Sequence, residues 1–118
     1  MTPLMVSINA SAPLSAAATL MRSNHVGFLP VRAQGRLVGS VTDRDIVVRA
    51  VAEALDIGET PVEAIMTPRV LSVRDDVDTD DALRIMDREQ VSRLMVVDSQ
   101  DQLVGILSLR DIPQTPIG

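Results

Sequence analysis

The sequence predicts an α+β fold made of two pseudo-symmetric halves, each with the order strand, helix, strand, strand, helix. The first observation behind this prediction is a tandem repeat, in which Met1-Thr2-Pro3 recurs as Met66-Thr67-Pro68. The second is that residues 37–46 are echoed by residues 103–112, each an apolar strand that passes through a glycine and a hydroxyl residue to an Arg-Asp pair. The chain is therefore a duplication, and repeats must be recognised first because they determine the fold.

Within each copy the apolar periodicity changes in the same order, which distinguishes strands from helices. Helices are indicated where apolar residues recur at helical spacing, within 14–21 and within 79–86. Tight polar turns at 33–35 and 99–101 favour antiparallel hairpins. The expected strands are 5–8, 28–32 and 36–41 in the first copy and 70–73, 93–98 and 102–107 in the second.

The final helix is expected to differ between the copies. In the first copy it is long, ends near Gly58 and is followed by a helical turn at 62–65. Val47, Ala50, Val51 and Ala54 are expected on one face of this helix. In the second copy Pro113 and Pro116 prevent a normal continuation of the helix.

These elements divide the chain into a first copy with its connecting helix, residues 1–58, and a second copy, residues 59–118. Neither half is large enough to bury an aliphatic sheet face by itself. We therefore expect the two halves to pack sheet to sheet as one compact module.

Composition excludes several classes of function. The net charge is −5, and all eleven basic residues are arginine, so a general nucleic-acid binder, a lysine-dependent phosphate loop and Schiff-base chemistry are not expected. The chain has no cysteine and one histidine, and no catalytic or metal-ligating constellation stands out. With no secretory signal and no apolar run of about 20 residues, a cytoplasmic protein without a membrane partner is expected.

Each strand-to-helix junction carries residues that suit a nucleotide. Thr42 and Ser108 offer hydroxyl groups and Arg44 offers a guanidinium for phosphate, as does Arg110 in the second copy. The carboxylates that follow can accept hydrogen bonds from a ribose diol; they belong to Asp45 and Asp111. The alternative is structural, because Thr-x-x-Asp and Ser-x-x-Asp also match a capping-box pattern that needs no ligand.

The duplicated Met-Thr-Pro segments, the Leu29-Pro30-Val31 strand and the Gly-x-x-[Ser/Thr]-x-x-Asp endings closely resemble a tandem pair of cystathionine-β-synthase-type (CBS) domains, a Bateman module. The resemblance covers nearly the whole chain. It implies two β-α-β-β-α motifs, adenine-nucleotide sensing in two clefts, and further pairing into a homodimer.

The resemblance also implies that each cleft is shared between the copies. One cleft would combine Ser108, Arg110 and Asp111 with Thr2, Ser7, Val26, Gly27 and Phe28. The other would combine Thr42, Arg44 and Asp45 with Thr67, Ser72, Val91, Ser92 and Arg93. Leu109 stands where the first copy has Asp43, which favours phosphate in the second cleft.

Two other features have simpler explanations than a ligand site. The acidic stretch 75–81 lacks the glycine and glutamate of a calcium loop, so we expect Asp78 to cap a helix and its neighbours to complement the helix dipole. His25 is expected at a helix end, as an exposed or capping residue.

The expected function is a regulatory module that binds an adenosine-containing molecule such as AMP, ADP or ATP, requires no cofactor and catalyses no reaction. The alternatives are a structural dimerisation module with no bound nucleotide, or a regulatory fragment of a larger enzyme or transporter.

Overall fold

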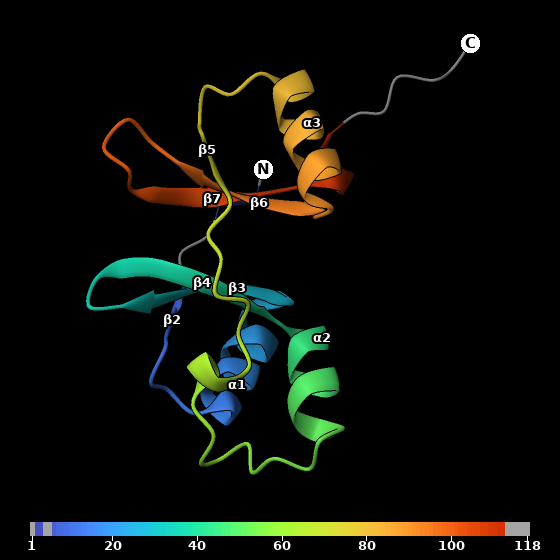
Figure 1. The fold of residues 1–118 in the computed structure, drawn as a ribbon. Coiled ribbons are helices and arrows are strands. Elements are labelled where there is room, and N and C mark those ends of the chain that lie inside the picture. Colours follow the sequence, from blue (N-terminus) through green and yellow to red (C-terminus); the bar gives the residue numbers. More distant parts are fainter. Residues whose placement is uncertain (1, 4–5, 113–118) are drawn as a thin grey trace. The chain divides into compact units, whose positions relative to one another are not determined.

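A computed structural model describes residues 2–3 and 6–112 and divides the chain into two compact units (Figure 1). One unit spans Val6–Val70 and is called the 6–70 unit. The other contains residues 71–112 together with residues 2–3 and is called the 71–112 unit. Each unit has its own sheet, helices and apolar core.

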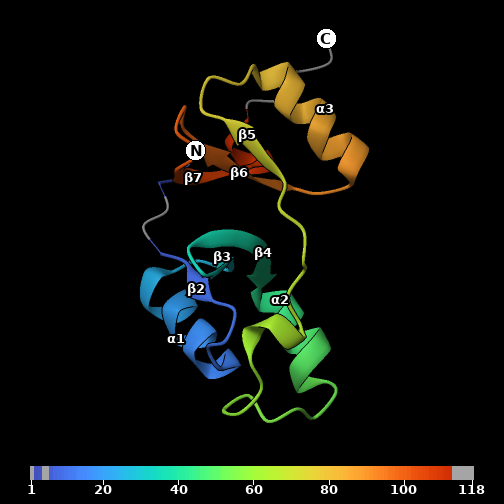
Figure 2. The ribbon, with the colours of Figure 1, turned by 60° about the vertical axis from the view of Figure 1, so that its left-hand side comes forward.

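The 6–70 unit is a three-stranded sheet with helices on one face. Strand β2 is parallel to β3, and β3 is antiparallel to β4, in the order β2-β3-β4. Its elements are β2 (Ile8–Asn9), α1 (Leu14–Asn24), β3 (Phe28–Ala33), β4 (Arg36–Thr42), α2 (Asp43–Ile46), the π-helical segment η1 (Val47–Val51) and the 3-10 turn η2 (Val62–Ala64). Figures 1 and 2 show α1 and α2 on the same face of this sheet.

The 71–112 unit repeats this order with one addition and one truncation. Its elements are β5 (Ser72–Arg74), α3 (Thr79–Glu89), β6 (Arg93–Val97), β7 (Leu103–Ser108) and the 3-10 turn η3 (Leu109–Asp111). The added strand is β1 (Thr2–Pro3), which pairs with β7 to give the order β1-β7-β6-β5. The predicted α+β class and the repeated CBS-type element order are confirmed.

The helices form where the sequence predicts them because their apolar faces fill the two cores. In α1, Leu14, Ala17 and Met21 are buried at helical spacing, and in α3 Ala82 and Met86 are buried in the same way. Both helices end in a left-handed residue, at His25 and Gln90, which occupy equivalent places in the repeat. Each core is aliphatic, and each belongs to one unit.

The two hairpins are antiparallel, as predicted. Gln34 (φ 52°) and Gly35 (φ 78°) turn the chain between β3 and β4, and Asp101 (φ 60°) turns it before β7. The positive φ angles match turns that follow the twist of the strands.

The opening segments of the two copies are exchanged between the units. Thr2 pairs with Ile106 of β7, whereas Thr67, which opens the second copy, forms a bridge with Ser40 of β4. The compact units therefore do not coincide with residues 1–58 and 59–118. The division of the sequence into copies at that point stays a prediction.

Gly39 is required for this bridge. A Cβ at Gly39 would overlap the carbonyl oxygen of Thr67, which exchanges two backbone hydrogen bonds with Ser40 at 2.9 and 3.0 Å. The group that approaches the strand glycine is thus the protein's own backbone.

The apolar face expected for the final helix in the first copy is mostly exposed. Ala50 is buried, but Val47 and Val51 are each 57% exposed and Ala54 is exposed. The buried side chains are those of Ile46 and Ala50, four residues apart, so the buried face begins one residue before the expected apolar face. The helix also changes to π-helical hydrogen bonding at Val47 and stops by Ala52.

Within the described residues, no helix is long and apolar enough to cross a membrane.

Candidate functional site

The first strand-to-helix junction closes a capping box. The backbone N–H of Asp45 donates to Thr42 Oγ1 at 3.0 Å, and the backbone N–H of Thr42 donates to Asp45 Oδ2 at 3.0 Å. The capping-box geometry predicted by the Thr-x-x-Asp pattern is therefore confirmed, and a role of these residues in binding stays a prediction. Thr42 and Asp45 are both half-buried, whereas Arg44 is exposed.

Asp43 fills the space beside Gly27 at this junction. Its backbone N–H donates to the Gly27 carbonyl oxygen at 3.0 Å, and its Oδ1 accepts the backbone N–H of Arg44 at 2.8 Å. A Cβ built on Gly27 would lie 2.7 Å from Asp43 Oδ2. A carboxylate therefore lies directly over the start of β3.

Arg49 connects the same junction to the segment that leads into the second copy. Its Nη1 donates to the carbonyl oxygen of Ile65 at 3.1 Å, and its Nε lies 3.8 Å from Asp45 Oδ1. Both oxygens of the Asp45 carboxylate thus face groups of the protein. Arg49 was not among the residues predicted from the sequence, although its position four residues after Asp45 on a helix is a spacing that favours an ion pair.

The second junction has the same backbone pattern with a different side chain in the place of Asp43. The backbone N–H and the hydroxyl of Ser108 both donate to Asp111 Oδ2, at 3.0 and 3.3 Å. Leu109 replaces the aspartate and donates its backbone N–H to the Ser92 carbonyl oxygen at 2.8 Å. The hydrogen bond from the Ser108 backbone holds the pKa of the Asp111 carboxyl below its ordinary value.

A cavity of about 150 Å³ opens at this second junction. Its lining residues are Ser92, Arg93, Ser108, Leu109 and Arg110. Four of these five were predicted from the sequence as ligand-binding residues. They meet because Arg93, at the start of β6, is in register with Ser108, at the end of β7. Two guanidinium groups and two hydroxyl groups are the donors that a phosphate requires.

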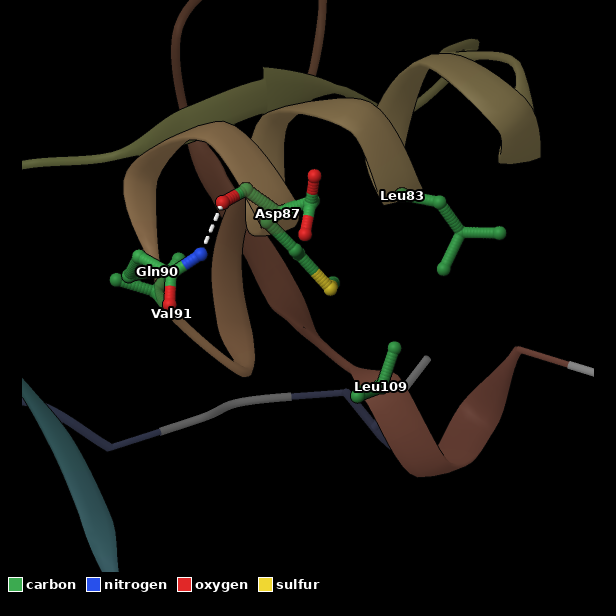
Figure 3. A pocket seen from close by; sticks show the side chains of 6 residues that line it. Leu83, Asp87, Gln90, Val91 and Leu109 are labelled. Carbon is green, nitrogen blue, oxygen red and sulfur yellow. Dashed lines mark hydrogen bonds between the residues drawn. The ribbon is translucent and has the colours of Figure 1, made fainter.

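A larger, apolar cavity of about 410 Å³ lies between α3 and η3 (Figure 3). It is lined by Leu83, Met86, Asp87, Gln90, Val91 and Leu109. In Figure 3, Leu83 extends from α3 and Leu109 from η3 on opposite sides of this cavity, and Gln90 Nε2 donates to the Asp87 carbonyl oxygen at 2.6 Å. In the 6–70 unit, α2 contacts the equivalent helix α1. The shortening of the second copy's final helix to η3 accounts for the hollow, which the sequence analysis missed apart from Val91.

The predicted sharing of each cleft between the two copies stays a prediction, while the middle strands have a definite place within each unit. Phe28 is in register with Thr42, and Ser92 is bonded to Leu109, so each middle strand adjoins the junction of its own copy. The reason is the hairpin, which places the start of one strand opposite the end of the next. The hairpin was itself predicted, so the signal was present in the sequence.

The remaining predicted residues divide by unit. Thr67 lies beside β4 of the 6–70 unit, and Thr2 lies in β1 beside β7 of the 71–112 unit, as their grouping with those junctions required. Ser7, Val26 and Gly27 belong to the 6–70 unit, and Ser72 and Val91 belong to the 71–112 unit. No geometry tests a role for Ser7 or Ser72 in binding, which stays a prediction.

The acidic stretch has the capping role predicted for it. Asp78 Oδ1 accepts the backbone N–H of Asp80 at 2.9 Å, and Asp80 and Asp81 occupy the first turn of α3. His25 ends α1 and is exposed, also as predicted.

Two β-α-β-β-α motifs with a Thr/Ser-x-x-Asp junction in each define a tandem CBS-domain protein. The family model described as the CBS domain matches residues 1–52 and 62–113. The chain therefore belongs to the CBS-domain family.

Similar proteins include chains of comparable length and much longer chains. The CBS domain-containing protein YhcV of Bacillus subtilis is 38% identical over 112 residues, covering 95% of this chain and 79% of the relative. The inosine-5'-monophosphate dehydrogenase of Thermoplasma acidophilum is 33% identical over 105 residues, but these cover 89% of this chain and only 20% of the enzyme.

A solved structure with a nucleotide is also similar. The CBS domain of a bacterial CNNM/CorC family Mg2+ transporter in complex with ATP has a TM-score of 0.80 and 27% sequence identity. The match covers 95% of this chain and 80% of that one.

Proposed function

We propose that this CBS pair is a regulatory module that binds adenine nucleotides and holds their phosphates at a strand-to-helix junction. The observation that carries the proposal is the cavity at the second junction, which is lined together by the residues Ser92, Arg93, Ser108 and Arg110. Guanidinium groups form bidentate hydrogen bonds with phosphate oxygens, and hydroxyls supply further donors.

Asp111 suits the ribose of such a ligand. It is exposed, and the low pKa of its carboxyl keeps it ionised at neutral pH, so that it accepts hydrogen bonds from a diol. Negative charge would repel phosphate, which makes a hydroxyl-bearing part of the ligand the better partner for this residue. The ATP complex of the similar transporter domain supports a nucleotide as the ligand class.

Binding would regulate by favouring one arrangement of the protein over another, because a ligand shifts a conformational equilibrium by its difference in affinity for the two states. The proposal assigns no reaction to the chain. The similarity to an enzyme supports this, because it is confined to one fifth of that enzyme's length.

Calorimetric titration with AMP, ADP and ATP tests this function. We expect at least one nucleotide to bind below millimolar concentration and Arg110→Gln to weaken it by about 10-fold or more, because one charge-assisted hydrogen bond is lost. Arg84→Gln is the matched control. Arg84 is an exposed arginine on α3 that pairs with Asp81, so this substitution removes the same charge away from the cavity. The function is wrong if none of the three nucleotides binds and an Asp45→Ala/Asp111→Ala variant behaves as the wild type.

A second candidate function, a homodimerisation module, is favoured by exposed aliphatic side chains on and after η1. Val47 and Val51 are each 57% exposed, and Val48 is 51% exposed. Three exposed valines within five residues form an apolar helix surface of the kind that marks interaction sites. We propose that this surface packs against a second copy of the chain.

Sedimentation velocity distinguishes this candidate from nucleotide binding. We expect the wild type to be a dimer and the Val47→Glu/Val51→Glu variant to be a monomer. The control Val70→Glu, in the connecting segment, should remain a dimer. A wild type that is monomeric at about 100 μM contradicts it, since a specific interface that fills a regulatory role reaches micromolar affinity.

A further inference from the structure

The two junctions, although equivalent in the repeat, carry different charges. At the second junction, Arg93 and Arg110 face the cavity and Asp111 is the nearby carboxylate. At the first junction the repeat places Phe28 where Arg93 stands and Asp43 where Leu109 stands. At these two pairs of positions the first junction therefore has one cation fewer and one carboxylate more.

The additional carboxylate lies against Gly27 at the start of β3. Asp43 Oδ2 approaches Gly27 so closely that a Cβ there would lie 2.7 Å away. Gly27 is equivalent to Ser92, which lines the cavity of the second junction. A negative charge therefore lies beside this position in the first copy, where the second copy has the uncharged Leu109.

The first junction also has a further cation, Arg49, but its charge does not compensate for the Asp43 carboxylate. Arg49 lies 3.8 Å from Asp45 and is bonded through Nη1 to the Ile65 carbonyl oxygen, so its donors are directed to the protein itself. The equivalent position in the second copy is Thr115, which has no charge.

From these differences we propose that the chain binds one phosphate-bearing ligand, at the second junction, and that Asp43 excludes phosphate from the first. The inference rests on the proposed function and names which of the two sites is used. Like charges placed together are an effective device against an unwanted ligand. Leu109 and Asp43 are then the residues that determine the difference in specificity.

Isosteric variants isolate the charge from the shape. Asp43→Asn removes the carboxylate at nearly constant size, while Leu109→Asp and Leu109→Asn differ from one another only in charge. Titration of the full chain with ATP at constant ionic strength is expected to give one site per chain for the wild type. Leu109→Asp should bind at least about 10-fold more weakly than Leu109→Asn, and Asp43→Asn should gain a second site.

Asp76→Asn is the control, because Asp76 is an exposed residue in the turn after β5 and its substitution changes the net charge equally. We expect this variant to keep one site. Two equal sites in the wild type, or equal affinities of Leu109→Asp and Leu109→Asn, would overturn the inference.

Titration with tripolyphosphate separates the inference from the proposed function. Binding of tripolyphosphate, but not of ATP, with the same dependence on residues 43 and 109 would retain the charge selectivity and reject adenine nucleotides as the ligand. Failure of both probes with the wild type and all variants would reject the two proposals together.

Discussion

Asp43 and Gly27 are in contact through both backbone and side chain. The Asp43 N–H donates to the Gly27 carbonyl at 3.0 Å, and its carboxylate leaves no room for a β-carbon on Gly27. The contact ties the start of β3 to the start of α2. In the second copy, Leu109 and Ser92 form the equivalent backbone hydrogen bond without the carboxylate.

Gly27→Ala is expected to have a small effect that depends on Asp43. A β-carbon must displace the carboxylate and its hydrogen bond with Arg44 N, which lowers the free energy of unfolding by about 1 kcal/mol. The reduced flexibility of the unfolded chain without this glycine raises it by about 0.4–1 kcal/mol. In an Asp43→Ala background the same substitution should stabilise the protein. A double-mutant cycle of urea unfolding measures the coupling between residues 27 and 43. Additive effects would show that their contact does not contribute to stability.

Gly39→Ala is expected to destabilise far more, by at least about 2 kcal/mol, because its β-carbon meets the Thr67 carbonyl, which is backbone and cannot rotate away. Gly35→Ala is the matched control. Its β-carbon would meet no atom within 4 Å, so it carries only the strain of a positive φ, about 1 kcal/mol. Equal unfolding free energies for the two variants would contradict the close approach at Gly39.

Thr42→Ala should lower the free energy of unfolding by about 1 kcal/mol through loss of the helix cap, and Thr42→Ser should restore most of it. Chemical denaturation at pH 7 measures both. Because Asp45 shares the capping box, Thr42→Ala and Asp45→Ala should be less than additive when combined.

The pH dependence of Asp111 has a definite sign. A folded-state pKa below the ordinary value means that the ionised carboxylate stabilises the fold at neutral pH and that this contribution is lost as pH falls through the lowered pKa. The melting temperature of the wild type should therefore exceed that of Asp111→Asn at pH 7, and the difference should shrink below about pH 4. The effect is small, because Asp111 is exposed and screened by solvent. A difference that grows in acid would contradict the assignment.

Much of the fold follows from local signals in the sequence. The helix end at His25, the two hairpins and the Asp78 cap depend on neighbouring residues, so periodicity and turn chemistry were sufficient to predict them. The capping boxes at Thr42 and Ser108 were visible in the same way. Their chemistry is local, and the duplication presented each pattern twice.

Other features depend on contacts between distant segments. Nothing local to Thr67 indicates that its backbone pairs with Ser40 rather than with its own copy, since a two-residue strand carries no register signal. The buried face beginning at Ile46 was missed because five of the six residues in 46–51, all except Arg49, are apolar and fit several helix registers. The cavity beside α3 arises from a helix that is shortened, and its volume cannot be derived from composition.

The crystal structure of the chain grown with ATP tests the central claim most directly. We predict phosphate oxygens within about 3 Å of the Arg110 guanidinium at the second junction, with the Asp43 carboxylate still lying over Gly27. Nucleotide density at the first junction with the second empty, or crystals that contain no nucleotide at millimolar ATP, would contradict the account.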